Sequence, residues 1–282
     1  MNKSYITFFV ERVPLVPQLI LSFGLTTTGL FLSNSTFNTI SYLLVALIVF
    51  IFLSQLRFMD ELKDFEKDKV ANPTRPMPRG LISTHQVKKI IKYTNRILLV
   101  LNLSLLSFGP APFLYLALTL VWLQLMFYEF FIGETLSRYP LIYAFSHQII
   151  IVPLILFISS TFNSSFALQE SFFCSLMILG SFFAYEVGRK LNPLSHPILK
   201  TYLIEYGKMK TFLLSLSLLA FSSFFAFQIG LENIILPLAI VTASSYYLIF
   251  KKPSSYKITE GIITLNLIVS IWIIPIKGWL LG

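Results

Sequence analysis

Three aspartates recur at every fourth position in one polar segment of the sequence. Asp60, Asp64 and Asp68 follow a long apolar run. At helical spacing their carboxylates lie about 6 Å apart on one slowly drifting face, where two such charges repel by roughly 3 kcal/mol at an effective dielectric constant near 20. Magnesium ions that bridge the carboxylates to a phosphate group would offset this repulsion. The spacing predicts such a site; the alternative is a solvated helix end with ion pairs such as Asp60 with Lys63 and Asp64 with Lys67.

A proline-rich segment follows directly. It reads Asn72-Pro73-Thr74-Arg75-Pro76-Met77-Pro78-Arg79-Gly80. The prolines prevent a helix, and the two arginines have no nearby acids in the sequence. Arg75 and Arg79 can therefore bind a diphosphate in bidentate fashion over the carboxylate-bound metal, and Lys67 is predicted as a further diphosphate contact. The alternative is a pair of cationic anchors at lipid headgroups.

The elements that position these residues are predicted to be membrane-spanning helices. Of 282 residues, 55% are hydrophobic and only 12% charged, with a mean hydropathy of +0.75, whereas soluble domains carry about 25% charged residues. This composition excludes a soluble catalytic domain, and the single Cys174 excludes a disulfide framework. The continuous apolar runs predict nine helices. They cover residues 14–32, 40–59, 87–108, 111–132, 140–160, 170–188, 211–229, 234–250 and 260–280.

The basic residues predict the orientation of these helices. With nine spans, 21 of the 22 Lys and Arg residues fall in the N-terminal tail, in the even-numbered connections or in the span ends that adjoin them, and only Lys277 lies on the other side. The positive-inside rule then places the N-terminus and the polar segments in the cytoplasm, in what is expected to be the inner membrane of a prokaryote. The net charge of +9 is attributed to these loops and not to nucleic-acid binding.

The first polar segment resembles the signature of the UbiA superfamily of intramembrane prenyltransferases. That signature is NxxxDxxxD at the end of the second helix, followed by an Arg-Pro segment and a turn of small residues. The corresponding residues here are Asp60, Asp64, Asp68, Asn72, Arg75-Pro76, Pro78 and Gly80, with Asp60 where the family usually has Asn. The resemblance implies that the three aspartates are catalytic magnesium ligands and that the substrate is an isoprenyl diphosphate.

The second polar segment departs from the family pattern. The family usually has a second motif, DxxxD, where this chain has Glu186 and, four residues later, Lys190. The resemblance implies that Glu186 is a further catalytic metal ligand, and that Lys200, in a Lys-Thr pair before Gly207, contacts the diphosphate. Arg189 and Lys190 can supply fixed positive charge in place of a second magnesium ion. Alternatively, Glu186 and Lys190 form an i, i+4 pair at the helix end, with Arg189 at the headgroups.

Other ionisable residues carry weaker signals. The basic pair that the family often has after Tyr128 is missing; Glu129 and Glu134 stand there instead, as a base, as extra ligands or as partners of Arg138. The three histidines lack metal-ligand spacing. His147, beside Ser146 and Gln148, is interpreted as a packed, hydrogen-bonded residue.

The sequence thus predicts one all-α membrane domain over residues 1–282, with nine helices around a central cavity and a cytoplasmic cap. The predicted reaction is magnesium-dependent ionisation of an isoprenyl diphosphate and transfer of the prenyl group to a hydrophobic acceptor, among membrane lipids and without an implied protein partner. A membrane terpene cyclase, which needs no acceptor, is the first alternative. A transporter is the more remote one, because intramembrane charge is also typical of that class.

Overall fold

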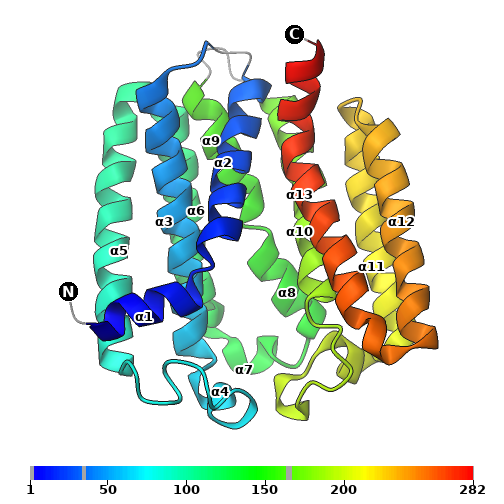
Figure 1. The fold of residues 1–282 in the computed structure, drawn as a ribbon. Coiled ribbons are helices and arrows are strands. Elements are labelled where there is room, and N and C mark those ends of the chain that lie inside the picture. Colours follow the sequence, from blue (N-terminus) through cyan, green and yellow to red (C-terminus); the bar gives the residue numbers. More distant parts are fainter. Residues whose placement is uncertain (1–2, 34–35, 163–166, 282) are drawn as a thin grey trace.

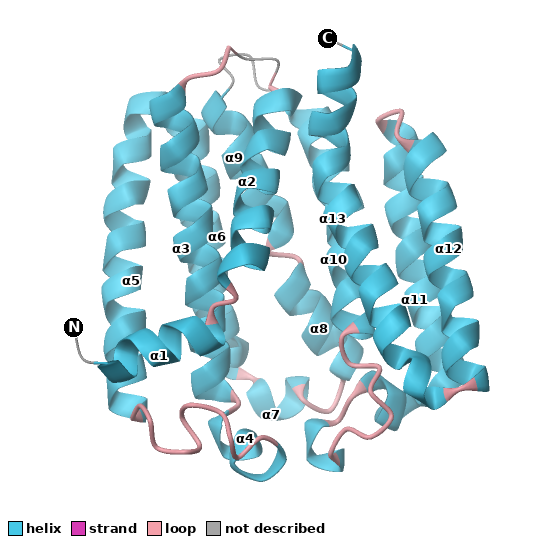
Figure 2. Ribbon diagram, in the orientation of Figure 1, coloured by secondary structure: helices cyan, strands magenta, loops and turns pink. Residues whose placement is uncertain are grey.

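The computed structural model describes residues 3–33, 36–162 and 167–281, and all regular elements in these ranges are helical (Figure 2). The longer helices are α1 (Lys3–Arg12), α2 (Leu15–Leu32), α3 (Thr39–Lys63), α5 (Thr84–Ser104), α6 (Pro110–Phe127), α8 (Pro140–Gln148), α9 (Ile151–Phe162), α10 (Leu168–Gly188), α11 (Tyr202–Gln228), α12 (Glu232–Lys251) and α13 (Tyr256–Leu281). The short ones are α4 (Phe65–Ala71), α7 (Gly133–Leu136), η1 (Leu105–Phe108), η2 (Glu129–Phe131), η3 (Pro197–Leu199) and η4 (Pro253–Ser255).

The long helices form a bundle of two rows. One row runs α5, α3, α2, α13, α12, and the other runs α6, α9, α10, α11, with each helix in contact with its neighbours in the row. Contacts of α2 with α9 and of α10 with α13 join the rows in the middle (Figure 1). Two glycines permit close approach, because a Cβ on Gly29 would clash with Ile158 and a Cβ on Gly188 with Ile263. The predicted all-helical membrane fold is confirmed.

Eight of the nine predicted spans are confirmed as helices long and apolar enough to cross a membrane, within the described residues. The exception is 87–108, which forms α5 and η1. Its first half exposes Lys88, Lys89, Lys92 and Arg96. The composition of α5 is therefore too polar for it to count among the helices that are apolar enough to cross a membrane. It nevertheless packs against α3 and α6 and stands beside them in the bundle (Figure 1). The chain ends consequently lie at opposite ends of the bundle.

The predicted span 140–160 is not one continuous helix. It consists of α8 and α9, which separate after Gln148. Pro153 explains the break, because proline has no N–H to donate and its ring clashes with the carbonyl of residue 149. The backbone instead makes a tighter bond from Val152 N–H to the Ile149 carbonyl (3.0 Å). The polar residues of α8 are thereby directed independently of α9.

The polar segments lie together at one end of the bundle, where α1, α4 and α7 are also found (Figure 1). Here α4, from the first polar segment, contacts η3, from the second. A left-handed Gly207 (φ 74°) breaks α11 after its first turn and sets off a short helix over residues 202–206. The other surfaces of the bundle expose apolar side chains such as Ile40, Leu99 and Leu118, as expected for helices that face lipid.

Candidate active site at the polar end of the bundle

Asp60 and Asp64 lie at the end of α3 with both carboxylates exposed. Helical hydrogen bonding continues through the break after Lys63, since Asp64 N–H donates to the Asp60 carbonyl and Asp68 N–H to the Asp64 carbonyl (2.8 Å each). The acids therefore keep the predicted i, i+4 register. Within the described residues, neither Asp60 nor Asp64 has an ion pair or a side-chain hydrogen bond, so the ion pairs expected with Lys63 and Lys67 do not form.

Asp68 differs from the other two acids. Its side chain is only 2% exposed, and Oδ2 pairs with Arg75 Nη1 at 2.5 Å. Oδ1 accepts a hydrogen bond from Asn72 Nδ2 at 2.7 Å. Both oxygens are thus occupied by the proline-rich segment that follows α4, so Asp68 holds that segment in place.

The predicted four-carboxylate site is therefore not assembled in this structure. Across the described ranges, no group of three or more Asp, Glu, His or Cys residues is placed to hold a metal ion. The physical reason is that Asp68 and Glu186 are already neutralised by protein cations. Of these four acids, only Asp60 and Asp64 retain carboxylates without a partner in the described part of the chain.

Arg79 points away from these acids. Its guanidinium pairs with Glu11 of α1 in bidentate fashion, at 2.6 and 2.9 Å. The hydrogen bond from Arg79 lowers the pKa of Glu11. Next to it, Arg12 pairs with Glu61, which is only 3% exposed. The two pairs fasten α1 to the first polar segment, and Arg79 is not presented to a diphosphate as predicted.

In the second polar segment, Glu186 is bound by two cations. Oε2 lies 2.5 Å from Arg189 Nε, and Oε1 lies 2.6 Å from Lys190 Nζ. This is the helix-end ion pair of Glu186 with Lys190 that was the alternative prediction, and it also includes Arg189. Glu186 raises the pKa of Arg189, so the arginine remains charged. The trio carries one net positive charge.

The two polar segments meet electrostatically across the end of the bundle. Asp60 interacts electrostatically with Asp64 and with Arg189. Asp60 and Arg189 are more than a hundred residues apart in the sequence. Lys67 and Lys200 are exposed, and neither has an ion pair in the described part of the chain. Unpaired carboxylates and available cations therefore occur at the same end of the bundle.

A second polar cluster lies beside Asp60. Lys63 Nζ donates to Tyr143 OH (3.0 Å) and to the Met126 carbonyl (3.2 Å), and it lies 3.4 Å from both Glu129 Oε1 and His147 Nε2. Tyr143 OH donates to Glu129 at 3.3 Å. Sequence reasoning did not foresee this cluster. The available signal was a run of polar residues on α8 ahead of Pro153, inside an apolar span.

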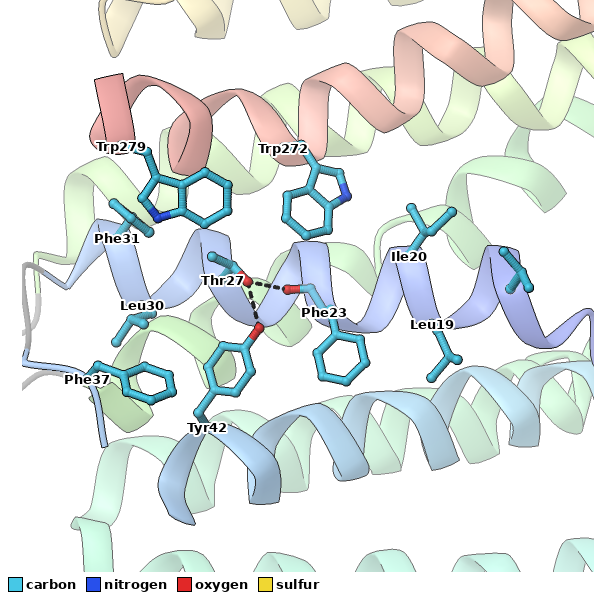
Figure 3. Close-up of a pocket in the computed structure, with 11 residues that line it drawn as sticks. Leu19, Ile20, Phe23, Thr27, Leu30, Phe31, Phe37, Tyr42, Trp272 and Trp279 are labelled. Atoms are coloured by element: carbon cyan, nitrogen blue, oxygen red, sulfur yellow. Dashed lines mark hydrogen bonds between the residues drawn. The ribbon is translucent and has the colours of Figure 1, made fainter. Parts of the chain in front are cut away.

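An apolar groove of about 600 Å³ runs along the flank of the bundle. It is bounded by α2, α3 and α13, and Phe23, Tyr42 and Trp272 contribute to its walls (Figure 3). The Thr27 hydroxyl bonds to Tyr42 OH at 2.8 Å and to the Phe23 carbonyl. None of the described residues that line this groove is charged, so it fits an apolar chain rather than a diphosphate.

Comparison with known proteins agrees with this architecture. A solved structure described as digeranylgeranylglyceryl phosphate synthase in membranes superposes with a TM-score of 0.62 over 95% of this chain and 98% of that one, at 20% identity. A digeranylgeranylglyceryl phosphate synthase of Methanococcus aeolicus is 37% identical over 79 residues, which span 28% of each protein. The resemblance to the UbiA superfamily is confirmed. No family model matches the sequence.

Proposed function

We propose that this UbiA-like protein is a membrane prenyltransferase that ionises an isoprenyl diphosphate with the help of magnesium and transfers the prenyl group to a hydrophobic acceptor. The observation that carries the proposal is the pair of unpaired carboxylates, Asp60 and Asp64, within electrostatic range of Arg189. The likeness to digeranylgeranylglyceryl phosphate synthase supports the reaction class.

The chemistry of Asp60 and Asp64 fits magnesium. Magnesium takes one or two protein carboxylates and fills its octahedron with phosphate oxygens and water, and these two exposed acids on one helical face have no competing cation among the described residues. A magnesium ion held there would neutralise the developing charge of the diphosphate. Asp68 does not fit this role, because Arg75 and Asn72 occupy its oxygens.

Protein cations would hold the other side of the diphosphate. Arg189 and Lys190 present a net positive charge with Glu186, and Lys67 and Lys200 have no acidic partner in the described ranges. Arg75 is one third exposed beside Asp68, which leaves part of its guanidinium fork for a phosphate oxygen. Such charges stabilise the leaving diphosphate most when water is excluded.

The acceptor is proposed to be a membrane lipid with a free hydroxyl group. The relative's name describes a product with two geranylgeranyl groups on a glyceryl phosphate. By this analogy, the acceptor would carry an apolar chain, for which the groove beside α2 has room, and a phosphate group, which exposed cations such as Lys67 and Lys200 could contact.

The test is an assay of the purified protein in detergent with geranyl, farnesyl or geranylgeranyl diphosphate and magnesium, with and without a prenylglyceryl phosphate. Organic extracts are analysed by mass spectrometry, and released diphosphate is measured in parallel. We expect a doubly prenylated lipid that forms only when magnesium and acceptor are present. A cyclic hydrocarbon formed without acceptor, or the absence of any turnover, would overturn the proposal.

A further inference from the structure

We propose that His147 is the general base that removes the proton from the acceptor hydroxyl. The inference rests on the proposed prenyl transfer and adds the residue that completes it. Attack by an alcohol on an allylic carbon requires the O–H proton to leave, and a positioned neutral imidazole is a common acceptor of such a proton. The contacts of His147 hold its imidazole in place and in the neutral form.

The hydrogen bonds of His147 fix which ring nitrogen carries the proton. Nδ1 lies 2.7 Å from the Tyr143 backbone carbonyl, which only accepts, so Nδ1 must be the donor. Nε2 lies 3.4 Å from Lys63 Nζ, which as an ammonium group only donates. Nε2 therefore presents a lone pair, and the ring is neutral. Stacking on Tyr143, with ring centroids 4.2 Å apart, holds the ring in this orientation.

His147 also lies where an acceptor hydroxyl can meet the diphosphate site. Together with Asp60, Lys63 and Met126 it lines a small cleft of about 20 Å³, which has room for about one water molecule. A hydroxyl group is of that size. The acceptor's reactive oxygen would therefore lie between the imidazole and the end of α3, where Asp60 is proposed to bind the metal.

Charged groups on three elements face His147. The Lys63 ammonium on α3 is the nearest of these charges, 3.4 Å from Nε2, and it pairs with Glu129 on η2 at 3.4 Å, while Glu186 on α10 is a further charge in range. Asp60 shares the cleft and Tyr143 shares α8. Glu129 is held in this position by an unusual backbone: Glu129, Phe130 and Phe131 all have left-handed φ values of 50° to 60°. Such strain is frequent at functional sites.

The step balances without a further reactant. The C–O bond of the isoprenyl diphosphate breaks, and its electron pair leaves with the diphosphate. The acceptor oxygen forms a new C–O bond to the allylic carbon, and its proton passes to Nε2 of His147. The resulting imidazolium, next to the Lys63–Glu129 pair, then releases its proton to water.

The experiment compares the two halves of the reaction in His147→Asn. Asparagine can keep the hydrogen bond to the Tyr143 carbonyl but cannot act as a base. We expect prenyl transfer to fall by about 100-fold, as is typical for loss of general-base catalysis, while slow release of diphosphate by hydrolysis changes only severalfold. The loss of rate toward acidic pH, which protonation of His147 causes in the wild type, should also disappear. His85→Asn, which alters an exposed histidine on α5, should match the wild type.

Chemical rescue separates a base from a packing residue. In His147→Ala, added imidazole should restore transfer, and the rescued rate should rise with the neutral fraction of imidazole, even if His147→Asn is too unstable to assay. Wild-type transfer and an unchanged acid limb in His147→Asn, or no rescue of His147→Ala, would overturn the role of His147 while leaving prenyl transfer intact. If the wild type releases no diphosphate from any substrate, the proposed function fails, and the inference fails with it.

Discussion

The two polar segments carry charge in opposite ways. In the first, Asp60 and Asp64 are exposed and have no protein cation bound to them in the described chain. In the second, Glu186 is bound by both Arg189 and Lys190. The first segment therefore offers negative charge to an external cation, and the second offers a residual positive charge to an anion. A magnesium diphosphate is complementary to both, whereas a single segment would attract only one of its components.

Whether a carboxylate is already bound by another side chain is thus a better guide to its proposed role here than its residue type. Asp68 and Glu186 are carboxylates that were predicted as metal ligands, yet their oxygens are occupied by neighbouring side chains. Breaking such a partly buried pair leaves an uncompensated charge and costs stability. Removing an unpaired carboxylate instead relieves repulsion. Mutations in the two groups should consequently separate loss of activity from loss of folding.

The largest effect is expected for Asp60→Asn and Asp64→Asn. Each removes one proposed magnesium ligand, so diphosphate release should fall by about 100-fold or more, whereas the melting temperature should stay constant or rise. Glu66→Gln is the matched control, because it removes an exposed acid that pairs only with Lys69. Equal losses in all three variants, measured by released diphosphate over a magnesium titration, would contradict the comparison.

A smaller and opposite pair of effects is expected in the second segment. Arg189→Gln should raise the KM for the prenyl diphosphate about tenfold, the equivalent of one charged hydrogen bond. Glu186→Gln frees two cations and should leave that KM unchanged or lower it. If Glu186 were a metal ligand, Glu186→Gln would instead abolish turnover. Steady-state kinetics of both variants at fixed magnesium distinguish the two roles.

The buried pair that anchors α1 should affect folding and not chemistry. Arg12→Met leaves the carboxylate of Glu61, which is 3% exposed, without its cation, at a cost of about 3 kcal/mol. The double variant Arg12→Met, Glu61→Leu removes both charges and should recover most of that loss. Thermal unfolding in detergent measures both. A double variant as unstable as the single one would show that packing, and not the unpaired charge, is responsible.

The smallest effect concerns Glu11 and its pH dependence. Because Arg79 lowers the pKa of Glu11 in the folded protein, this contact contributes stability above the unfolded pKa, whose reference value is 4.5, and loses it as the pH falls through the lower folded pKa. The melting-temperature difference between the wild type and Glu11→Gln should therefore shrink from pH 7 to pH 3. A difference that is independent of pH would show that the pair contributes nothing.

The sequence by itself determined the class of protein and the location of its polar chemistry. Long apolar runs specify helices because a helix satisfies its own backbone hydrogen bonds in lipid, and charge was concentrated in two connections. The i, i+4 register of Asp60, Asp64 and Asp68 persisted because it depends only on local helical geometry. Pro153 also encodes the break in the fifth span locally. Because residues on both sides of this break are apolar, the hydropathy of the span does not reveal it.

Only the tertiary structure decided which charges remain free. Arg79 pairs with Glu11, which is 68 residues away in the chain. Lys63 contacts Glu129 and His147 and does not pair with Asp60 on its own helix. Sequence spacing brings together residues three or four positions apart on one helix, but pairing across helices depends on how the bundle packs. The same packing brings Arg189 toward Asp60 and turns Asp68 toward Arg75. The site is consequently a property of the assembled bundle, because electrostatic partners are chosen by distance in space.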